Sequence, residues 1–101
     1  MIRHVSVLTF VPGTSDQDIA KLEAELAALP SQIPELTEYR FGRDAGLSDG
    51  NASFGIVADF PSIESFVAYR DHPAHQAVLR DTIKPILAHR SAVQYEIEPL
   101  G

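Results

Sequence analysis

Apolar and polar residues alternate along residues 2–10, a pattern that predicts a β-strand. One face of this strand carries His4 among apolar residues, and the other face carries Val5 and Val7. Because apolar side chains occur on both faces, we expect both faces of the strand to be covered in the folded protein. The same kind of alternation predicts three further strands, at residues 36–43, 52–60 and 91–97.

Apolar residues recur at helical spacing in the two segments between these strands. The first helix is expected to begin after Ser15, a good N-cap, and to end before Pro30. The second is expected to begin after Ser62 and to break at Pro73, where a new helix starts that Pro85 should bend. The residues expected to be buried at the start of this second segment are Ile63, Phe66 and Val67.

The predicted order of elements, β-α-β-β-α-β, is that of the ferredoxin-like α+β fold, an antiparallel four-stranded sheet with helices on one face. The helix-free face would still carry Val5, Val7 and Val57, and a bare apolar sheet face is unstable in water. We therefore expect a homodimer that joins the helix-free faces of two copies, with residues 1–101 forming a single domain.

The net charge of −6, with eight scattered Lys and Arg residues, argues against a nucleic-acid partner and against an anionic membrane surface. The chain has no cysteine, which excludes disulfides, thiolate metal sites and cysteine nucleophiles. No apolar run has the length of a membrane span or the form of a signal peptide. We therefore expect no membrane partner and a cytoplasmic location.

The segment YRDHPAHQ, which starts at Tyr69, places a tyrosine and two histidines around a proline. One interpretation is structural: Asp71 or His72 caps the helix that begins at Pro73. The other is catalytic, because a neutral imidazole with a pKa of about 6.5 accepts a proton, whereas a protonated phenol donates to a carbonyl oxygen. His75 is expected on the apolar side of its helix, toward the sheet.

His4 lies on the strand face expected to meet the helices, so it points toward the same space as His75. Two histidines on apolar surfaces predict a pocket with a polar floor. His4, His72 and His75 could in principle form a metal site. Two observations argue against it: Pro73 disturbs the helical spacing of the last two histidines, and no carboxylate completes the set of ligands. No phosphate loop or dinucleotide fingerprint is present, so we expect neither metal nor cofactor.

Three segments carry a resemblance to a known family: MIRHVSVLTF, ADFPSIESFVAYRDHPAHQ and RSAVQYEIEP. With them the chain resembles the stress-responsive A/B barrel domain (Dabb) family over nearly its whole length. The most specific part is a tyrosine a few residues before His-Pro-x-His, here Tyr69 before His72 and His75, and His4 matches as well. The resemblance implies a dimeric α+β barrel, in which two ferredoxin-like subunits pack sheet against sheet.

The best understood branch of this family is the plant polyketide cyclases of the olivetolic acid cyclase type. There a tyrosine and the second histidine of His-Pro-Ala-His promote an intramolecular aldol closure of a linear poly-β-ketone thioester. The resemblance implies that Tyr69 and His75 are catalytic and that His4 is a pocket residue. It also implies an apolar, substrate-binding pocket wall at Leu8, Ile56 and Ala58.

The chain departs from the plant cyclases in two places. The large aromatic residues that shape the plant pocket from the first and last helices are absent; Leu22, Leu26 and Ile86 stand near those places, and we expect them to be substrate-binding residues here. The aspartate that many members carry in the last strand is absent from Val93-Gln94-Tyr95. The acid–base pair is therefore kept while the wall that shapes the substrate differs.

We therefore expect one small apolar pocket per subunit, which binds or transforms a carbonyl-bearing small molecule through His75 and Tyr69. The reaction that the resemblance implies is a polyketide cyclase-like, aldol-type closure. Two alternatives stay open. One is a non-catalytic stress-response or interaction protein, in which the histidines only organise the helix joint. The other is a cofactor-free monooxygenase, a chemistry found in other dimeric α+β barrels.

Overall fold

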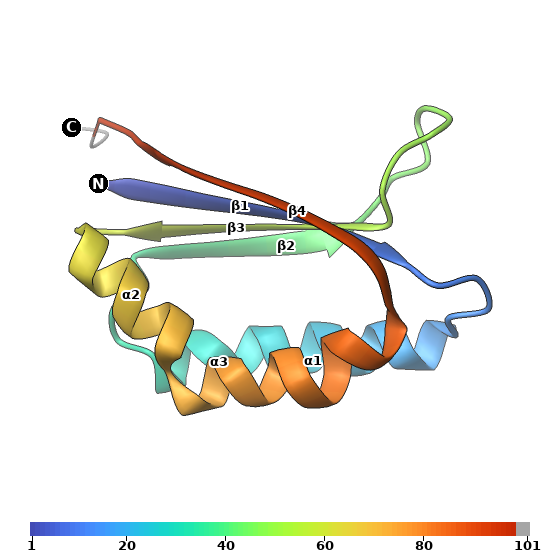
Figure 1. The fold of residues 1–101 in the computed structure, drawn as a ribbon, viewed down its shortest axis with the longest axis horizontal. Helices are drawn as coiled ribbons and strands as arrows, with labels where there is room; N and C mark the ends of the chain where they lie inside the picture. Colours follow the sequence, from blue (N-terminus) through green and yellow to red (C-terminus); the bar gives the residue numbers. More distant parts are fainter. Residues whose placement is uncertain (99–101) are drawn as a thin grey trace.

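The computed structural model describes residues 1–98, which form a four-stranded antiparallel sheet with helices packed against one face (Figure 1). The strands are β1 (Ile2–Phe10), β2 (Glu38–Arg43), β3 (Phe54–Phe60) and β4 (Leu87–Glu96). The helices are α1 (Asp16–Gln32), α2 (Ile63–Asp71) and α3 (Pro73–Val78), the last continuing as a π-helical segment, η1 (Leu79–Ile83), and a 3₁₀ turn, η2 (Lys84–Ile86). The β-α-β-β-α-β order predicted from the sequence is confirmed.

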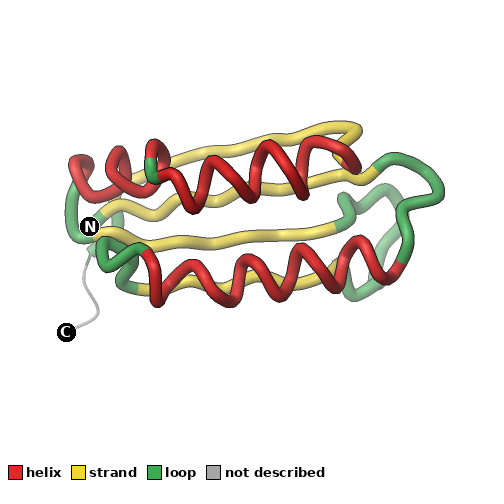
Figure 2. Tube along the Cα trace, turned by 90° about the horizontal axis from the view of Figure 1, so that it is seen from below, coloured by secondary structure: helices red, strands yellow, loops and turns green. Residues whose placement is uncertain are grey.

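The sheet order is β2-β3-β1-β4, so β1 lies in the middle and pairs with both β3 and β4. Figure 2 shows the helices side by side in front of the strands, all on the same side of the sheet. Within residues 1–98, the structure has no helix with the length and apolar character of a membrane span.

The core lies between the sheet and the helices. The alternating side chains of β1 and β3 that face the helices are buried, in agreement with the predicted pattern. The largest side chains with almost no exposed surface come from the sheet, from α1 and from the residue that follows α1: Leu8, Leu22, Leu26, Leu29, Ile33, Phe54 and Phe60. Burial of this apolar surface is the main force that holds the helices on the sheet.

Helix α1 begins as predicted but does not end before Pro30. Its first turn is fixed by a capping box, in which the Ser15 Oγ accepts from the Asp18 N–H at 3.1 Å and the Asp18 carboxylate accepts from the Ser15 N–H. Pro30 removes only its own donor, and the helix continues to Gln32. The Ile33 N–H donates to the Leu29 carbonyl at 2.9 Å, and the full burial of Ile33 holds this last turn in place.

Strand boundaries differ from the sequence prediction because pairing between strands decides them. Strand β4 begins at Leu87 instead of residue 91, since it pairs with the whole length of β1, with an irregularity between Thr9 and Phe10. Strands β2 and β3 each begin two residues later than predicted, at Glu38 and Phe54.

Ile63 was expected to be buried, but 60% of its surface is exposed. It stands at the first position of α2, and the contact with the sheet is made one turn later. There the Phe66 ring meets the Phe60 ring edge-on, with centroids 5.6 Å apart.

The helix-free face of the sheet carries exposed apolar side chains: Val7 (38% exposed), Tyr95 (46%) and Val93 (53%). Its charged residues include Arg3 and Asp59, which form a two-pronged ion pair at 2.8 and 2.9 Å, so these two charges are already matched. This face is therefore apolar enough to bind another surface without leaving those two charges buried and unpaired.

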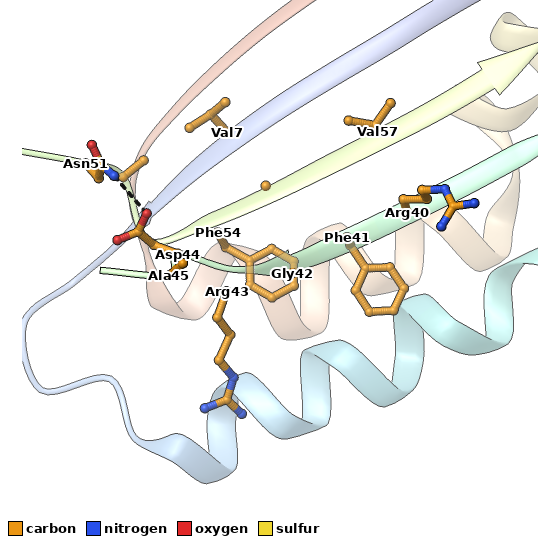
Figure 3. A pocket seen from close by; sticks show the side chains of 12 residues that line it. Val7, Arg40, Phe41, Gly42, Arg43, Asp44, Ala45, Asn51, Phe54 and Val57 are labelled. Atoms are coloured by element: carbon orange, nitrogen blue, oxygen red, sulfur yellow. Dashed lines mark hydrogen bonds between the residues drawn. The ribbon is translucent and has the colours of Figure 1, made fainter. Parts of the chain in front are cut away.

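A shallow groove of about 640 Å³, here called the glycine groove, lies on this face over β2 and β3 (Figure 3). Its floor contains Gly42 and Gly55, which face each other across the two strands. A Cβ atom added to either glycine would meet nothing within 4 Å. Figure 3 shows Val7 and Val57 on the side of the strands away from the helices, beside this open space.

The core position of Leu22 gives a testable prediction. Leu22 has no exposed surface, so Leu22→Ala should leave a cavity and lower the free energy of unfolding by about 2–5 kcal/mol. The matched control is Leu47→Ala, which truncates a leucine that is 87% exposed and should change stability by less than about 0.5 kcal/mol. Urea titration followed by circular dichroism measures both, and equal effects would contradict the assignment of Leu22 to the core.

Candidate active site

The helix joint between α2 and α3 is organised by His72. Pro73 keeps His72 in an extended conformation (φ −64°, ψ 134°), which ends α2 and starts α3. The His72 Nδ1 accepts from the Ala74 N–H at 3.0 Å and so caps α3. Asp71, the alternative cap, instead forms an ion pair with Arg70.

The joint also fixes the orientation and the tautomer of His75. The His75 Nδ1 lies 3.1 Å from the carbonyl oxygen of Arg70, which belongs to the last turn of α2. A carbonyl oxygen only accepts, so Nδ1 must be the donor and carry the proton of the neutral ring. The lone pair of that ring is therefore on Nε2, the atom that can accept a proton from another molecule.

The ring of Tyr69 lies against His75, with ring centroids 4.1 Å apart. Tyr69 is almost fully buried and also packs on Phe60, while its hydroxyl lies 3.5 Å from that of Tyr39. Burial raises the pKa of Tyr69 above the ordinary tyrosine value, and burial together with Tyr69 raises that of Tyr39. Both phenols therefore stay protonated at neutral pH and act as hydrogen-bond donors.

His4 enters the same region from β1. The amide nitrogen of Gln94, directly across on β4, donates to the His4 Nδ1 at 2.8 Å, which leaves the proton of the neutral ring on Nε2. Burial, followed by the charges of Arg90 and His75, lowers the pKa of His4 to about 4. His4 is thus a neutral donor at physiological pH.

These side chains surround a pocket of about 440 Å³, here called the histidine pocket. It lies between the β1–β4 side of the sheet and the helices α2 and α3, and its lining residues are His4, Phe66, Tyr69, Arg70, His75, Leu79, Arg90 and Gln94. A narrower space of about 30 Å³, the inner extension, shares five of these residues and reaches Ser6, Leu8, Leu26, Tyr39, Ile56 and Ile83. The two ends of the π-helical segment, Leu79 and Ile83, face this inner extension.

The structure brings some of the predicted site residues together and leaves others apart. His4, Tyr69 and His75 line both spaces, and Leu8, Leu26 and Ile56 line the inner extension. Three predicted wall residues, Leu22, Ala58 and Ile86, do not line either space and are packed in the core instead. The catalytic and binding roles assigned to these residues stay predictions.

Sequence reasoning missed Tyr39, Arg90 and Gln94. A signal was present for Gln94, because the alternation of the last strand places it on the face opposite Val93, toward the helices. Arg90 was missed because the last strand was expected to begin one residue after it. Tyr39 was expected to alternate with polar neighbours, but its approach to Tyr69 depends on how α2 packs on the sheet.

The histidine pocket is cationic in character. Arg70 and Arg90 line it, and no aspartate or glutamate does. Burial is the main cause that lowers the pKa of His75, the charges of Arg90 and His72 act in the same direction, and the Arg70 carbonyl opposes them. His75 is consequently a neutral base at physiological pH. Among residues 1–98, no group of three or more His, Cys, Asp or Glu is placed to hold a metal ion.

Comparison with known proteins gives a consistent result for the fold. The sequence model of the family described as Stress responsive A/B Barrel Domain matches residues 2–97. No match was found among curated proteins. A dimeric ferredoxin-like protein of unknown function from Thermobifida fusca YX is 41% identical, with 95% of this chain and 90% of that chain covered and a TM-score of 0.88.

Two further solved structures are similar over nearly their whole length. A Dabb family protein with a ferredoxin-like fold from Mesorhizobium loti is 25% identical, with 99% and 97% of the two chains covered and a TM-score of 0.78. Hydroxynitrile lyase from Passiflora edulis is 18% identical, with 99% and 95% covered and a TM-score of 0.83. At this identity, the likeness to the lyase is one of fold.

The lowered pKa of His4 predicts a pH-dependent stability. The unfolded chain binds a proton at the ordinary histidine pKa of 6.5, whereas folded His4 does so only at about 4. Stability should therefore fall as the pH drops from about 6.5 to about 4, by about 3 kcal/mol at most, and this contribution should level off below that range. Urea titrations across this range should show a smaller loss for His4→Gln than for the unmodified protein.

The control for this measurement is His89→Gln, which removes an exposed histidine and should keep the full pH dependence. An identical loss of stability in the unmodified protein and in His4→Gln would contradict the burial of a neutral His4.

Proposed function

The chain belongs to the stress-responsive A/B barrel domain family, and from this premise we propose that it is a homodimer whose histidine pocket binds a small carbonyl compound and transforms it by acid–base chemistry. In this proposal His75 is the general base and Tyr69 is the hydrogen-bond donor to the carbonyl oxygen. The observation that carries it is the tautomer of His75. Its Nδ1 is occupied by a backbone carbonyl, so its basic Nε2 is left free beside a protonated phenol.

The proposed step is removal of a proton from the carbon next to the carbonyl group. The C–H bond breaks, its proton moves to the His75 Nε2, and its electron pair moves onto the carbonyl oxygen to give an enolate. The Tyr69 hydroxyl donates to this oxygen and stabilises the charge more in the transition state than in the substrate. When the Tyr39 hydroxyl donates to Tyr69, the proton of Tyr69 itself stays available for the substrate.

The enolate then has two simple fates. It can take a proton at another position, which is an isomerisation, or it can attack a second carbonyl carbon of the same molecule. The second fate is an aldol closure, the reaction implied by the resemblance to plant polyketide cyclases. Tyr69 and His75 supply the pair that such a closure needs, while the leucine and isoleucine residues in place of large aromatic residues favour a different substrate shape.

The helix-free sheet face supports the homodimer. The 41% identical relative is described as a dimeric ferredoxin-like protein. In this chain the exposed Val7, Val93 and Tyr95 lie on that face together with the glycine groove, which leaves room for side chains of a second copy. A stable interface of this kind should bury more than about 1,000 Å² in total. We expect the dimer to work in the cytoplasm.

The catalytic proposal is tested by following hydrogen–deuterium exchange at the carbon next to the carbonyl in a panel of β-diketones and short β-polyketides. His75→Ala and Tyr69→Phe should each lower the exchange rate by about 10²–10⁴-fold without unfolding the protein. His72→Ala should lower the free energy of unfolding by about 1 kcal/mol, because it removes a helix cap, and should lower the exchange rate far less than the other two variants, because Pro73 still ends α2 at the joint.

The same assay has a pH signature. Because the pKa of His75 is lowered, the rate should stay constant on acidification past 6.5 and fall only at lower pH. Exchange that survives His75→Ala unchanged would remove the base assignment. A panel without any exchange or binding would favour the interaction-protein alternative.

The dimer proposal predicts that Val93→Glu, which places a charge on the helix-free face, raises the dimer dissociation constant at least tenfold. Ile63→Glu is the matched control, since Ile63 is equally apolar and exposed but lies on α2. Light scattering coupled to size-exclusion chromatography at micromolar concentration measures the mass of each variant. A monomeric unmodified protein would contradict the proposal.

A further inference from the structure

One of the six arginines lacks a carboxylate partner. Arg90 makes no ion pair and no side-chain hydrogen bond with another residue in the described part of the chain, residues 1–98. The other five are each paired: Arg3 with Asp59, Arg40 with Glu38, Arg43 with Asp16 and Glu23, Arg70 with Asp71, and Arg80 with Asp81. The chain has 14 acidic residues and a net charge of −6, so carboxylates are not scarce. Arg90 lacks a partner because of where it lies.

Arg90 is located at the histidine pocket. On β4 it stands directly opposite Leu8, so it projects on the helix side of the sheet, and it lines both the pocket and the inner extension. Lys21 and Lys84, which form no ion pair within residues 1–98, are exposed like Arg90 but line neither space. Among residues 1–98, Arg90 is therefore the pocket cation without a carboxylate partner, since Arg70 pairs with Asp71.

The neighbours of Arg90 leave its charge unmatched. Within the described part of the chain no carboxylate lines the pocket, and the second arginine there, Arg70, is held by Asp71. The Arg90 charge reaches the reactive groups: it adds to burial in lowering the pKa of His4 and His75, and it partly opposes the effect of burial that raises the pKa of Tyr69. An anion in the pocket would both pair with Arg90 and relieve this charge.

We infer that Arg90 binds the carboxylate of the substrate, and that the substrate class is therefore a short 3-oxo acid. This inference rests on the proposed function of the same pocket. A guanidinium presents parallel N–H donors that match the two oxygens of a carboxylate. In a 3-oxo acid, the carbon that loses its proton lies between the carbonyl and the carboxylate. Tyr69 would hold the carbonyl end, Arg90 the carboxylate end, and His75 would meet the carbon between them.

The cation has a further role in this arrangement. An enolate formed next to a carboxylate places two negative charges a few ångströms apart, which disfavours proton removal. Arg90 offsets the first charge before the second one forms. The neutral analogue of the same substrate, its methyl ester, lacks this interaction and should bind more weakly.

The test compares acetoacetate with methyl acetoacetate as probes, using ligand-observed NMR titration of the full-length protein at low and at physiological salt. Acetoacetate should bind about 10–100-fold more tightly than the ester, the range expected for a charge-assisted hydrogen-bonded pair. Arg90→Met should remove this preference, and Arg90→Lys should retain only part of it. Arg80→Met, which removes an arginine outside the pocket, should leave the preference unchanged.

Other outcomes would overturn the inference. Equal binding of acid and ester, or no binding of either, shows that Arg90 does not hold a carboxylate. If Arg90→Met also weakens the dimer, its partner is a carboxylate of the second copy. Tighter binding of dihydroxyacetone phosphate than of acetoacetate would assign the site to phosphate esters instead.

The inference and the proposed function fail separately. Arg90-dependent binding of acetoacetate without deuterium exchange at its C2 would keep the anion site and contradict the catalytic proposal. Exchange that depends on His75 but is equally fast for acid and ester, and insensitive to Arg90→Met, would keep the catalytic proposal and contradict the anion site at Arg90.

Discussion

The site depends on the break in helical hydrogen bonding at Pro73. In a continuous helix the Arg70 carbonyl would accept from the Ala74 N–H, four residues later. The proline pushes His72 out of the helical region, and both groups find new partners: the Ala74 N–H donates to His72, and the Arg70 carbonyl accepts from the side chains of His75 and Gln76. One steric constraint thus caps a helix, fixes a tautomer and places an imidazole on a tyrosine ring. The two interpretations of this segment, joint and acid–base pair, are compatible, because the first histidine builds the joint that orients the second.

Periodicity was sufficient to predict the sheet, the helices and the caps, because each rests on local chemistry: alternation in β1, a serine before α1, a proline at the start of α3. It failed where distant segments decide the outcome. Pairing with β1 extends β4 back to Leu87, and this extension brings Arg90 into the sheet. Packing also decides which apolar side chains border an open space, so Leu26 lines the inner extension while Leu22, one turn earlier, fills the core. The sequence pattern marks both leucines as buried and cannot separate them.

The two faces of the sheet have different proposed roles, ligand binding on one and dimer contact on the other, and successive residues of a strand alternate between them. Along β1, His4 faces the histidine pocket and Leu8 faces its inner extension, whereas Val5 and Val7 face the surface proposed for the second copy. Neighbouring residues therefore carry different functions, and any shift of β1 by one position would exchange them. The pairing of β1 on both sides, with β3 and with β4, resists such a shift.

The central place of β1 also affects the order in which the protein can be made. The first strand to leave the ribosome needs the last strand as its neighbour, and the hydrogen bond between His4 and Gln94 joins residues 90 positions apart. Contacts with such large sequence separation form late and slow the folding of a domain. During synthesis, one edge of β1 stays unpaired until β4 has emerged. The side of the histidine pocket that β4 supplies therefore forms only when β4 pairs with β1, so pairing of these two strands is the step that completes the pocket.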